Sequence, residues 1–340
     1  MEYIDIRSDT VTKPSPAMRQ AIMDAVVGDD VFGEDPTVNK LQEKCSVITG
    51  KESALFVTSG CLANQLSIKS HTNPGDEIIC ESEAHIFNYE TAAPAVISNV
   101  QVMTVKGTSG VMDVEEIKKY VRTKEYYFPF TRLICLENTH NRAGGTIQPI
   151  ESIKEISGFA KENGIKMHLD GARIFNASVE TCISVKEYAS YFDSISFCFS
   201  KGLGAPVGSV ICGNSDFIIR AHKWRKILGG GMRQAGILAS AALYAVENNV
   251  NRLKEDHKKA KYFAEEISKF KGIEIDLDSV HTNIVVFSVS KYEKMDFISK
   301  LKEKGILISS GSFNNLRAVF HLDVSMENVQ KAVEVIKSFF

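Results

Sequence analysis

The fold of this chain is decided by the stretch Ser194-Ile195-Ser196-Phe197-Cys198-Phe199-Ser200-Lys201-Gly202. Its first six residues form an apolar, β-prone run, which is typical of a strand buried on both faces of a parallel sheet. Lys201 follows where that strand ends, and an amine partly removed from water there is more readily a neutral nucleophile. The string Ser-Lys-Gly is short, so by itself it is also compatible with a surface lysine at a strand end.

A second motif lies upstream, in Lys166-Met167-His168-Leu169-Asp170-Gly171-Ala172-Arg173. It places Asp170 at the C-terminal end of another buried strand, which is the edge where open α/β sheets bind their ligands. One crossover and one further strand separate Asp170 from Lys201, so both side chains can reach one crevice. A pyridine cofactor needs both groups, because the carboxylate keeps the ring nitrogen protonated and the amine holds the aldehyde carbon. Alone, Asp170 could equally be the N-cap of a helix.

A phosphate site is expected near an early strand, and Thr58-Ser59-Gly60-Cys61 supplies one. A strand runs into this segment and a helix opens from it, so backbone N–H groups and the helix dipole face the anion. Ser59 can add a hydroxyl, and Gly60 allows the backbone to approach closely. The alternative interpretation is an ordinary capped helix.

One of the eight histidines, His85, follows the strand 77–80 and is predicted to lie flat on the exposed face of the cofactor ring. Each motif is weak by itself. Together they occur in chain order at the strand ends of one sheet: phosphate loop, stacking histidine, ring-nitrogen acid and Schiff-base lysine. That coincidence predicts pyridoxal 5′-phosphate (PLP) as the cofactor, with Lys201, His85 and Asp170 as the catalytic residues and no metal.

The predicted fold class is α/β, namely PLP-dependent fold type I, with a mostly parallel seven-stranded sheet between helices and a small C-terminal α+β domain. The expected strands of the large sheet are 54–57, 77–80, 100–105, 133–137, 166–170, 194–199 and 209–212. Beyond residue 249 the pattern predicts a strand at 284–289, a helix at 295–304, a strand at 318–322 and a helix at 326–339. The predicted divisions are an N-terminal arm at 1–13, a PLP-binding domain at 14–248 and a small domain at 249–340.

Bulk composition excludes several classes of function. The net charge of −2, with scattered basic residues, gives no reason to expect nucleic acid or an anionic membrane as partner. The seven cysteines show neither zinc-ligand spacing nor a disulfide framework. The chain opens without a signal-peptide pattern and holds no long apolar run, so a cytoplasmic location is expected.

Over nearly its whole length the sequence resembles the low-specificity L-threonine aldolases, within the aspartate-aminotransferase-like fold of PLP enzymes. The matching motifs are Asp5–Thr12, Gly28–Thr37, Leu136–Asn141, His168–Arg173, Ser200–Leu203 and Leu228–Gln234. The resemblance implies retro-aldol cleavage of L-threonine or L-allo-threonine to glycine and acetaldehyde by a carbon–carbon lyase.

The resemblance also implies roles for individual residues. Ser8, Arg173 and Arg317 would hold the carboxylate of a β-hydroxy amino acid, since the planar guanidinium binds carboxylates bidentately. Cofactor binding would involve Ser59, Gly60, Cys61, His85, Asp170, Arg173 and Lys201. A homotetramer built of dimers is implied, with Arg233 reaching the phosphate of a neighbouring subunit.

Two positions depart from the family's usual pattern. Phe32 stands where many bacterial members have tyrosine, and Tyr127 stands where a histidine is associated with the β-hydroxyl of the substrate. Tyr127 is therefore a candidate substrate-binding residue, and the preference between threonine and allo-threonine stays open. The alternatives are another PLP reaction, either β-elimination or racemisation, and a non-catalytic PLP-fold protein.

Overall fold

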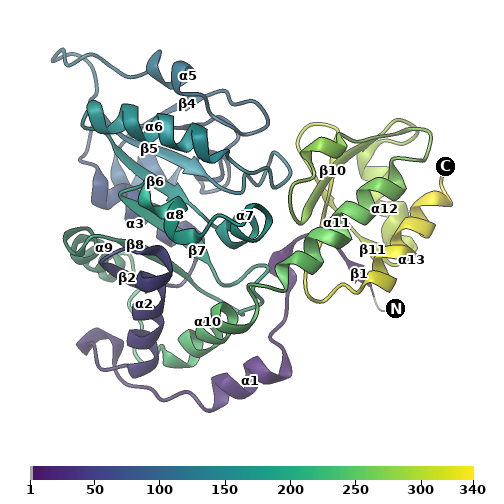
Figure 1. Ribbon diagram of the computed structural model, residues 1–340, viewed down its shortest axis with the longest axis horizontal. Coiled ribbons are helices and arrows are strands. Elements are labelled where there is room, and N and C mark those ends of the chain that lie inside the picture. The colour runs from purple at the N-terminus through teal and green to yellow at the C-terminus, as the bar shows by residue number, and fades with distance from the viewer. Residues whose placement is uncertain (1–2) are drawn as a thin grey trace.

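The computed structural model describes residues 3–340, and Figure 1 shows a large α/β unit beside a smaller one. The large unit is built on one seven-stranded sheet. In spatial order its strands are β2 (Ser53–Val57), β8 (Ser209–Gly213), β7 (Ser194–Cys198), β6 (Lys166–Asp170), β5 (Thr131–Glu137), β3 (Glu77–Glu81) and β4 (Gln101–Val105). β8 alone runs opposite to the other six strands, so the mostly parallel seven-stranded sheet is confirmed.

Both faces of this sheet are buried, as the continuous apolar runs predict. Successive side chains of a strand point to opposite faces. In β2, Ala54 and Phe56 pack in the core on one face, and Leu55 and Val57 pack in a separate cluster on the other. The same alternation holds in β5, where Ile134 and Leu136 face one core and Leu133 and Cys135 face another.

Helices cover the two faces unequally. α3 (Gly60–His71) and α9 (Ser215–Ile227) contact the sheet and each other on one side. The larger core on the other side includes α2 (Pro36–Thr49), α6 (Ile150–Glu162) and α8 (Val185–Ser190). The remaining helices of this unit are α1 (Pro16–Met23), α4 (His85–Asn88), α5 (Val114–Lys118), α7 (Ile174–Thr181) and α10 (Gly236–Asn248). None of the helices within residues 3–340 is long and apolar enough to span a membrane.

The start of α2 illustrates how the local sequence sets a helix boundary. Asp35 caps it, because its carboxylate accepts hydrogen bonds from the backbone N–H groups of Thr37 and Val38. Pro36 occupies the first helical position, where no N–H is needed. Gly50 closes the helix with a φ of 65°, a left-handed conformation that glycine adopts without steric cost.

The smaller unit holds an antiparallel sheet in the order β12 (Ser309–Ser310), β13 (Leu316–Val319), β10 (Ile284–Val289) and β9 (Ile273–Glu274). Its helices are α11 (Leu253–Ile267), α12 (Lys294–Glu303) and α13 (Met326–Lys337). The strand expected at 318–322 begins and ends earlier than predicted. Leu316 already pairs with both β10 and β12, whereas the chain turns at His321, whose C=O accepts from Val324.

The N-terminal segment belongs spatially with the smaller unit. β1 (Ile4–Asp5) pairs in parallel with β11 (Ile306–Leu307), and Ile4 and Ile6 pack in the core of that unit. The chain then passes through a short 3₁₀ turn (Asp9–Val11) and returns to the large unit at α1, as Figure 1 shows. The predicted divisions at residues 13 and 248 stay predictions.

Candidate active site

The site is built at the edge of the sheet where the parallel strands end. β5, β6 and β7 end at Glu137, Asp170 and Cys198, and Asp170 lies opposite Ser196 in the register of β6 and β7. Lys201 follows β7 by three residues. The crossover and the further strand expected between Asp170 and Lys201 are present as α7, α8 and β7.

Asp170 is a buried carboxylate whose charge has no cationic partner among residues 3–340. Its Oδ2 accepts a hydrogen bond of 2.7 Å from Asn64 Nδ2, and its Oδ1 accepts one of 3.1 Å from the N–H of Ala172. Among residues 3–340 no cationic side chain lies within ion-pair distance of it. Since a buried charge without a counter-charge is costly, this site favours a ligand that brings a positive charge.

The start of α3 forms an anion cradle. Ser59 caps the helix and its Oγ accepts from the N–H of Leu62 at 3.2 Å, which leaves the N–H groups of Gly60 and Cys61 directed out of the helix end. A Cβ at Gly60 would lie 2.9 Å from Cys198 Sγ, so only glycine brings the helix this close to β7. Burial raises the pKa of the Cys61 thiol to about 11, so this thiol is neutral and adds no negative charge to the cradle.

Glu90 joins His85 to α3, the helix whose start forms the cradle. Its fully buried carboxylate accepts hydrogen bonds from His85 Nδ1 at 2.9 Å, Asn64 Nδ2 at 2.7 Å and Gln65 Nε2 at 2.6 Å. Burial lowers the pKa of His85, but the hydrogen bond to Glu90 and the charges of Asp170 and Glu90 outweigh it, so the net shift is upward. Glu90 therefore fixes the imidazole through Nδ1 and leaves Nε2 to face a ligand.

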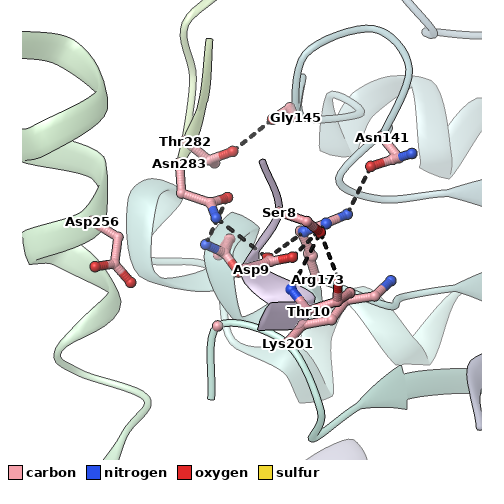
Figure 2. Close-up of polar contacts among 12 residues, drawn as sticks. Ser8, Asp9, Thr10, Asn141, Gly145, Arg173, Lys201, Asp256, Thr282 and Asn283 are labelled. Carbon is pink, nitrogen blue, oxygen red and sulfur yellow. Dashed lines mark hydrogen bonds and ion pairs between the residues drawn. The ribbon is translucent and has the colours of Figure 1, made fainter. Parts of the chain in front are cut away.

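Most of the hydrogen-bond donors of Arg173 are used by other residues of the protein. Its Nε and Nη2 form two parallel bonds of 2.7 Å to the carboxylate of Asp9, which also receives Asn283 Nδ2 at 3.4 Å (Figure 2). Burial favours the protonated acid, but the Arg173 guanidinium holds the pKa of Asp9 far below its usual range. Only Nη1 of Arg173 points elsewhere, donating to Asn141 Oδ1 at 3.1 Å.

Arg317 contrasts with Arg173 because no carboxylate within residues 3–340 pairs with it. Its Nη1 donates to the same Asn141 Oδ1 at 3.1 Å, and its buried Nε has no hydrogen-bond partner. Burial and the neighbouring charge of Arg173 lower the pKa of Arg317. Asn141 thus joins the two guanidinium groups, and Arg317 is the one left open to an anion.

Lys201 belongs to the same cluster of side chains as Asp9 and Arg173 (Figure 2). Its C=O accepts from Thr12 Oγ1 at 3.0 Å, and its ammonium group makes no hydrogen bond or ion pair with the described part of the chain. Figure 2 shows the Lys201 side chain beside Thr10 and Arg173, directed away from the Asp9 carboxylate. Ser8 caps the 3₁₀ turn here and accepts two bonds from Thr10.

Two predicted residues lie outside this cluster. Tyr127 is exposed before β5, at the opposite edge of the sheet, where its ring contacts Tyr126 and Phe128. Arg233 is exposed and pairs with Asp29 at 2.9 Å. Their predicted roles would require a second subunit and stay predictions.

Several residues of the site received no role from the sequence. Glu137 accepts from the backbone N–H of His85 at 2.7 Å and from that of Asn141 at 2.8 Å, so one carboxylate positions both loops. Asn141 and Asp9 lie within the motifs Leu136–Asn141 and Asp5–Thr12, which resemble those of the threonine aldolase family, but neither residue was given a role from the sequence. Glu90, five residues after His85, could have been suspected as its carboxylate partner, but no local pattern points to Asn64.

The residues present fit PLP. The cradle suits a phosphate, Lys201 an aldehyde, the unpaired Asp170 a protonated pyridine nitrogen, and the half-exposed His85 ring a flat aromatic face. The Sγ of Cys61, a ring nitrogen of His85 and an oxygen of Glu90 lie within 4.8 Å of one another, so these elements converge on one space. The same trio could ligate a metal only if the neutral thiol lost its proton.

Comparisons with known proteins show the family and the fold of this chain. The family described as "Beta-eliminating lyase" matches residues 5–290. The chain is 43% identical to low-specificity L-threonine aldolase 1 of Arabidopsis thaliana over 336 residues, covering 97% of this chain and 94% of that protein. It is 41% identical to the low specificity L-threonine aldolase of Escherichia coli K12, covering 99% of each. The solved structure of Leishmania major threonine aldolase shares the fold, with a TM-score of 0.84 at 18% identity and coverage of 98% and 99%.

Proposed function

The chain belongs to the β-eliminating lyase family and, within it, to the low-specificity L-threonine aldolases; from that premise we propose that it cleaves L-threonine and L-allo-threonine to glycine and acetaldehyde with PLP. The observation that supports this most directly is the placement of Asp170 and Lys201 at one edge of the sheet. Among residues 3–340, the buried Asp170 carboxylate has no cationic partner and the Lys201 amine has no anionic partner.

Four groups would hold the cofactor. The backbone of Gly60 and Cys61, with Ser59, would bind the phosphate, Asp170 the ring nitrogen and Lys201 the aldehyde carbon. His85 would cover one face of the ring. When bound, PLP supplies an electron-accepting ring that stabilises the negative charge developing at Cα.

The substrate carboxylate is assigned chiefly to Arg317. Arg317 lacks an acidic partner within residues 3–340, and Asn141 holds its Nη1 in place. Arg173 already makes a bidentate pair with Asp9, so its contribution is limited to Nη1 and to orienting Asn141. Ser8 adds a hydroxyl. This set fixes the amino acid while the reacting bond is broken.

His85 is the proposed base for the β-hydroxyl proton, acting directly or through water. Because Nδ1 is hydrogen-bonded to Glu90, Nε2 is the atom left to accept that proton. The carboxylate of Glu90 then stabilises the imidazolium that forms.

Two broader features belong to the same proposal. We infer a homotetramer built of dimers, supported by exposed apolar side chains at Met23, Val26, Phe32 and Ile237. Arg233 would then reach a neighbouring site, and Tyr127 would approach a substrate from another subunit. A cytoplasmic location is supported by the seven cysteines, all of them free thiols within residues 3–340.

The test is an aldehyde-release assay on the purified holoenzyme with L-threonine, L-allo-threonine and their D-isomers in parallel. Acetaldehyde and glycine in equal amounts from an L-isomer are expected. The threonine to allo-threonine ratio measures what Tyr127 does in place of histidine. Pyruvate and ammonia instead would indicate β-elimination, and a change of configuration without cleavage would indicate racemisation.

A further inference from the structure

A basic cavity lies at the amino edge of the large sheet, opposite the site described above. It has a volume of about 510 Å³ and lies beside the end of α3 and the starts of β5 and β6. The residues that line it include Lys69, Ser70, Arg132, Lys166, Arg220 and Trp224. We call it the basic pocket.

The charge of the basic pocket is one-sided, since four cationic side chains line it and no acidic one does. Arg132 and Lys166 pair with carboxylates outside the lining, at 3.2 and 2.8 Å. Within residues 3–340 no carboxylate lies within 4.0 Å of Lys69 or Arg220. Lys69 stands 4.8 Å over the ring of Trp224 instead. The pocket therefore has positive charge that the protein itself leaves unbalanced.

Helix capping accounts for only part of this arrangement. Arg220 Nε donates to the C=O of Ser70 at 3.1 Å, and cations at a helix C-terminus offset its dipole. Arg132 and Lys166 come from strands, so the helix does not explain them. Ser70 itself is 7% exposed and lines the pocket, yet its Oγ has no hydrogen-bond partner. This hydroxyl oxygen is closed off from solvent, so the four cationic side chains are what indicates a ligand.

A hydrogen-bond relay runs from this pocket to the active site. It starts at His71, which also lines the pocket, and passes through buried side chains. The links are His71 Nε2 to Ser194 Oγ at 2.8 Å, Ser194 Oγ to His168 Nδ1 at 2.9 Å, His168 Nε2 to Asn64 Oδ1 at 3.3 Å, and Asn64 Nδ2 to Asp170 Oδ2 at 2.7 Å.

The relay has one direction. The Asn64 oxygen can only accept, so His168 donates from Nε2 and accepts at Nδ1. Ser194 must then donate to His168 and accept from His71. Burial lowers the pKa of His71 to about 3 and that of His168 to about 4, so both rings are neutral, as this pattern requires. Each donor of the relay therefore points toward Asp170, and Asn64 donates in addition to Glu90.

We propose that the basic pocket binds a small oxyanion carrying at least two negative charges, and that its occupancy is transmitted through the relay to Asp170. The titratable groups around His71 are the neutral His168 and the charged Asp193, Lys166 and Arg220. An anion would offset the two cations among them, which raises the proton affinity of His71 and makes its N–H a weaker donor. Hydrogen bonds in a series polarise one another, so the hydrogen bond that Asn64 donates to Asp170 weakens as well. Binding and the state of the cofactor site are then reciprocally coupled.

The first test uses the fluorescence of Trp224, the one tryptophan in the chain. Holoenzyme is titrated with inorganic phosphate and, separately, with citrate, at ionic strength held constant with chloride. A saturable change is expected, and comparing the two probes separates a phosphate ligand from a carboxylate one. Arg220→Gln should weaken binding roughly tenfold, as expected for one charge-assisted bond. Lys223→Gln, on the same helix but outside the pocket, is the control; equal effects of the two substitutions, or no saturation with either probe, would overturn the site.

The second test addresses the coupling and rests on the proposed cofactor, whereas the fluorescence test does not. Phosphate should shift the visible absorbance band of the lysine-bound cofactor in the wild-type holoenzyme. Ser194→Ala interrupts the relay and should remove that shift while leaving the fluorescence titration unchanged. Ser194→Thr keeps the hydroxyl and should restore it. Binding without a spectral shift in the wild type, or a shift retained in Ser194→Ala, would overturn the coupling.

Discussion

Two arginines in this protein face opposite situations. Arg225 of α9 is buried and pairs with Asp30 at 2.7 Å, and it also donates to the C=O of Phe56. Arg317 of β13 is half-buried, is bonded only to the amide of Asn141, and has no carboxylate partner among residues 3–340. The first charge is neutralised within the chain and the second is not. The pair of Arg225 and Asp30 stabilises the fold. Arg317, Asp170 and Lys201, which have no oppositely charged partner among residues 3–340, are the groups that we propose to meet a ligand.

The largest effect is expected at Lys201. Lys201→Ala removes the only group proposed to form a covalent bond with the cofactor. The visible absorbance of the lysine-bound form should therefore disappear together with turnover. Thermal stability should change little, because the amine contacts nothing that the fold requires. Absorbance spectra and a melting curve measure both. A normal spectrum would show that this open charge does not hold the cofactor.

Asp170→Asn is expected to come next. The substitution keeps the shape and the bond to Asn64 but removes the charge that would meet the ring nitrogen. Turnover should fall on the order of 10²–10³-fold, the range for losing one preorganised electrostatic contact. Near-normal kcat in a cofactor-loaded variant would sink the assignment.

The comparison itself is sharpened by the matched pair Arg317→Gln and Arg225→Gln. Arg317→Gln should raise KM for the amino acid roughly 100-fold, as expected for loss of a charge-assisted bidentate contact, with little loss of stability. Arg225→Gln should leave KM unchanged and cost about 3–5 kcal/mol of folding free energy, because Asp30 is left buried and unpaired. Steady-state kinetics and denaturant unfolding separate the two. A stability loss in Arg317→Gln as large as that in Arg225→Gln would erase the distinction.

The smallest effect concerns the pH profile. Hydrogen bonding to Glu90 raises the pKa of His85, and a base works only when neutral, so activity should fall as the pH drops through that pKa. Glu90→Gln removes the negative partner and should move this acid limb to lower pH, with reduced kcat because the imidazolium is less stabilised. Since the folded pKa is raised, His85 also contributes stability that is complete below about pH 6.5 and lost as the pH rises. An unmoved acid limb in Glu90→Gln would mean that another group is the base.

The large sheet could be predicted because its information is local. A strand buried on both faces needs continuous apolar residues, and each of the seven expected strands is present within a few residues of its predicted place. That Lys201, Asp170 and the Ser59 loop lie near one another could be predicted for the same reason. Asp170 ends its strand, Ser59 and Lys201 follow two and three residues after theirs, and parallel strands bring their C-terminal ends to one edge.

The tertiary structure alone decided which charges are left open. The resemblance implied one role for both Arg173 and Arg317, but Asp9, brought from the far N-terminus, neutralises Arg173 and not Arg317. The hydrogen bond from Asn64 to Asp170 also depends on the tertiary structure, because it joins residues 106 positions apart. The partner of His85 differs, because Glu90 is only five residues away in the chain. Local periodicity specifies elements and the edge they share. The pairing of charges depends on contacts between distant segments, and no short pattern in the sequence encodes those.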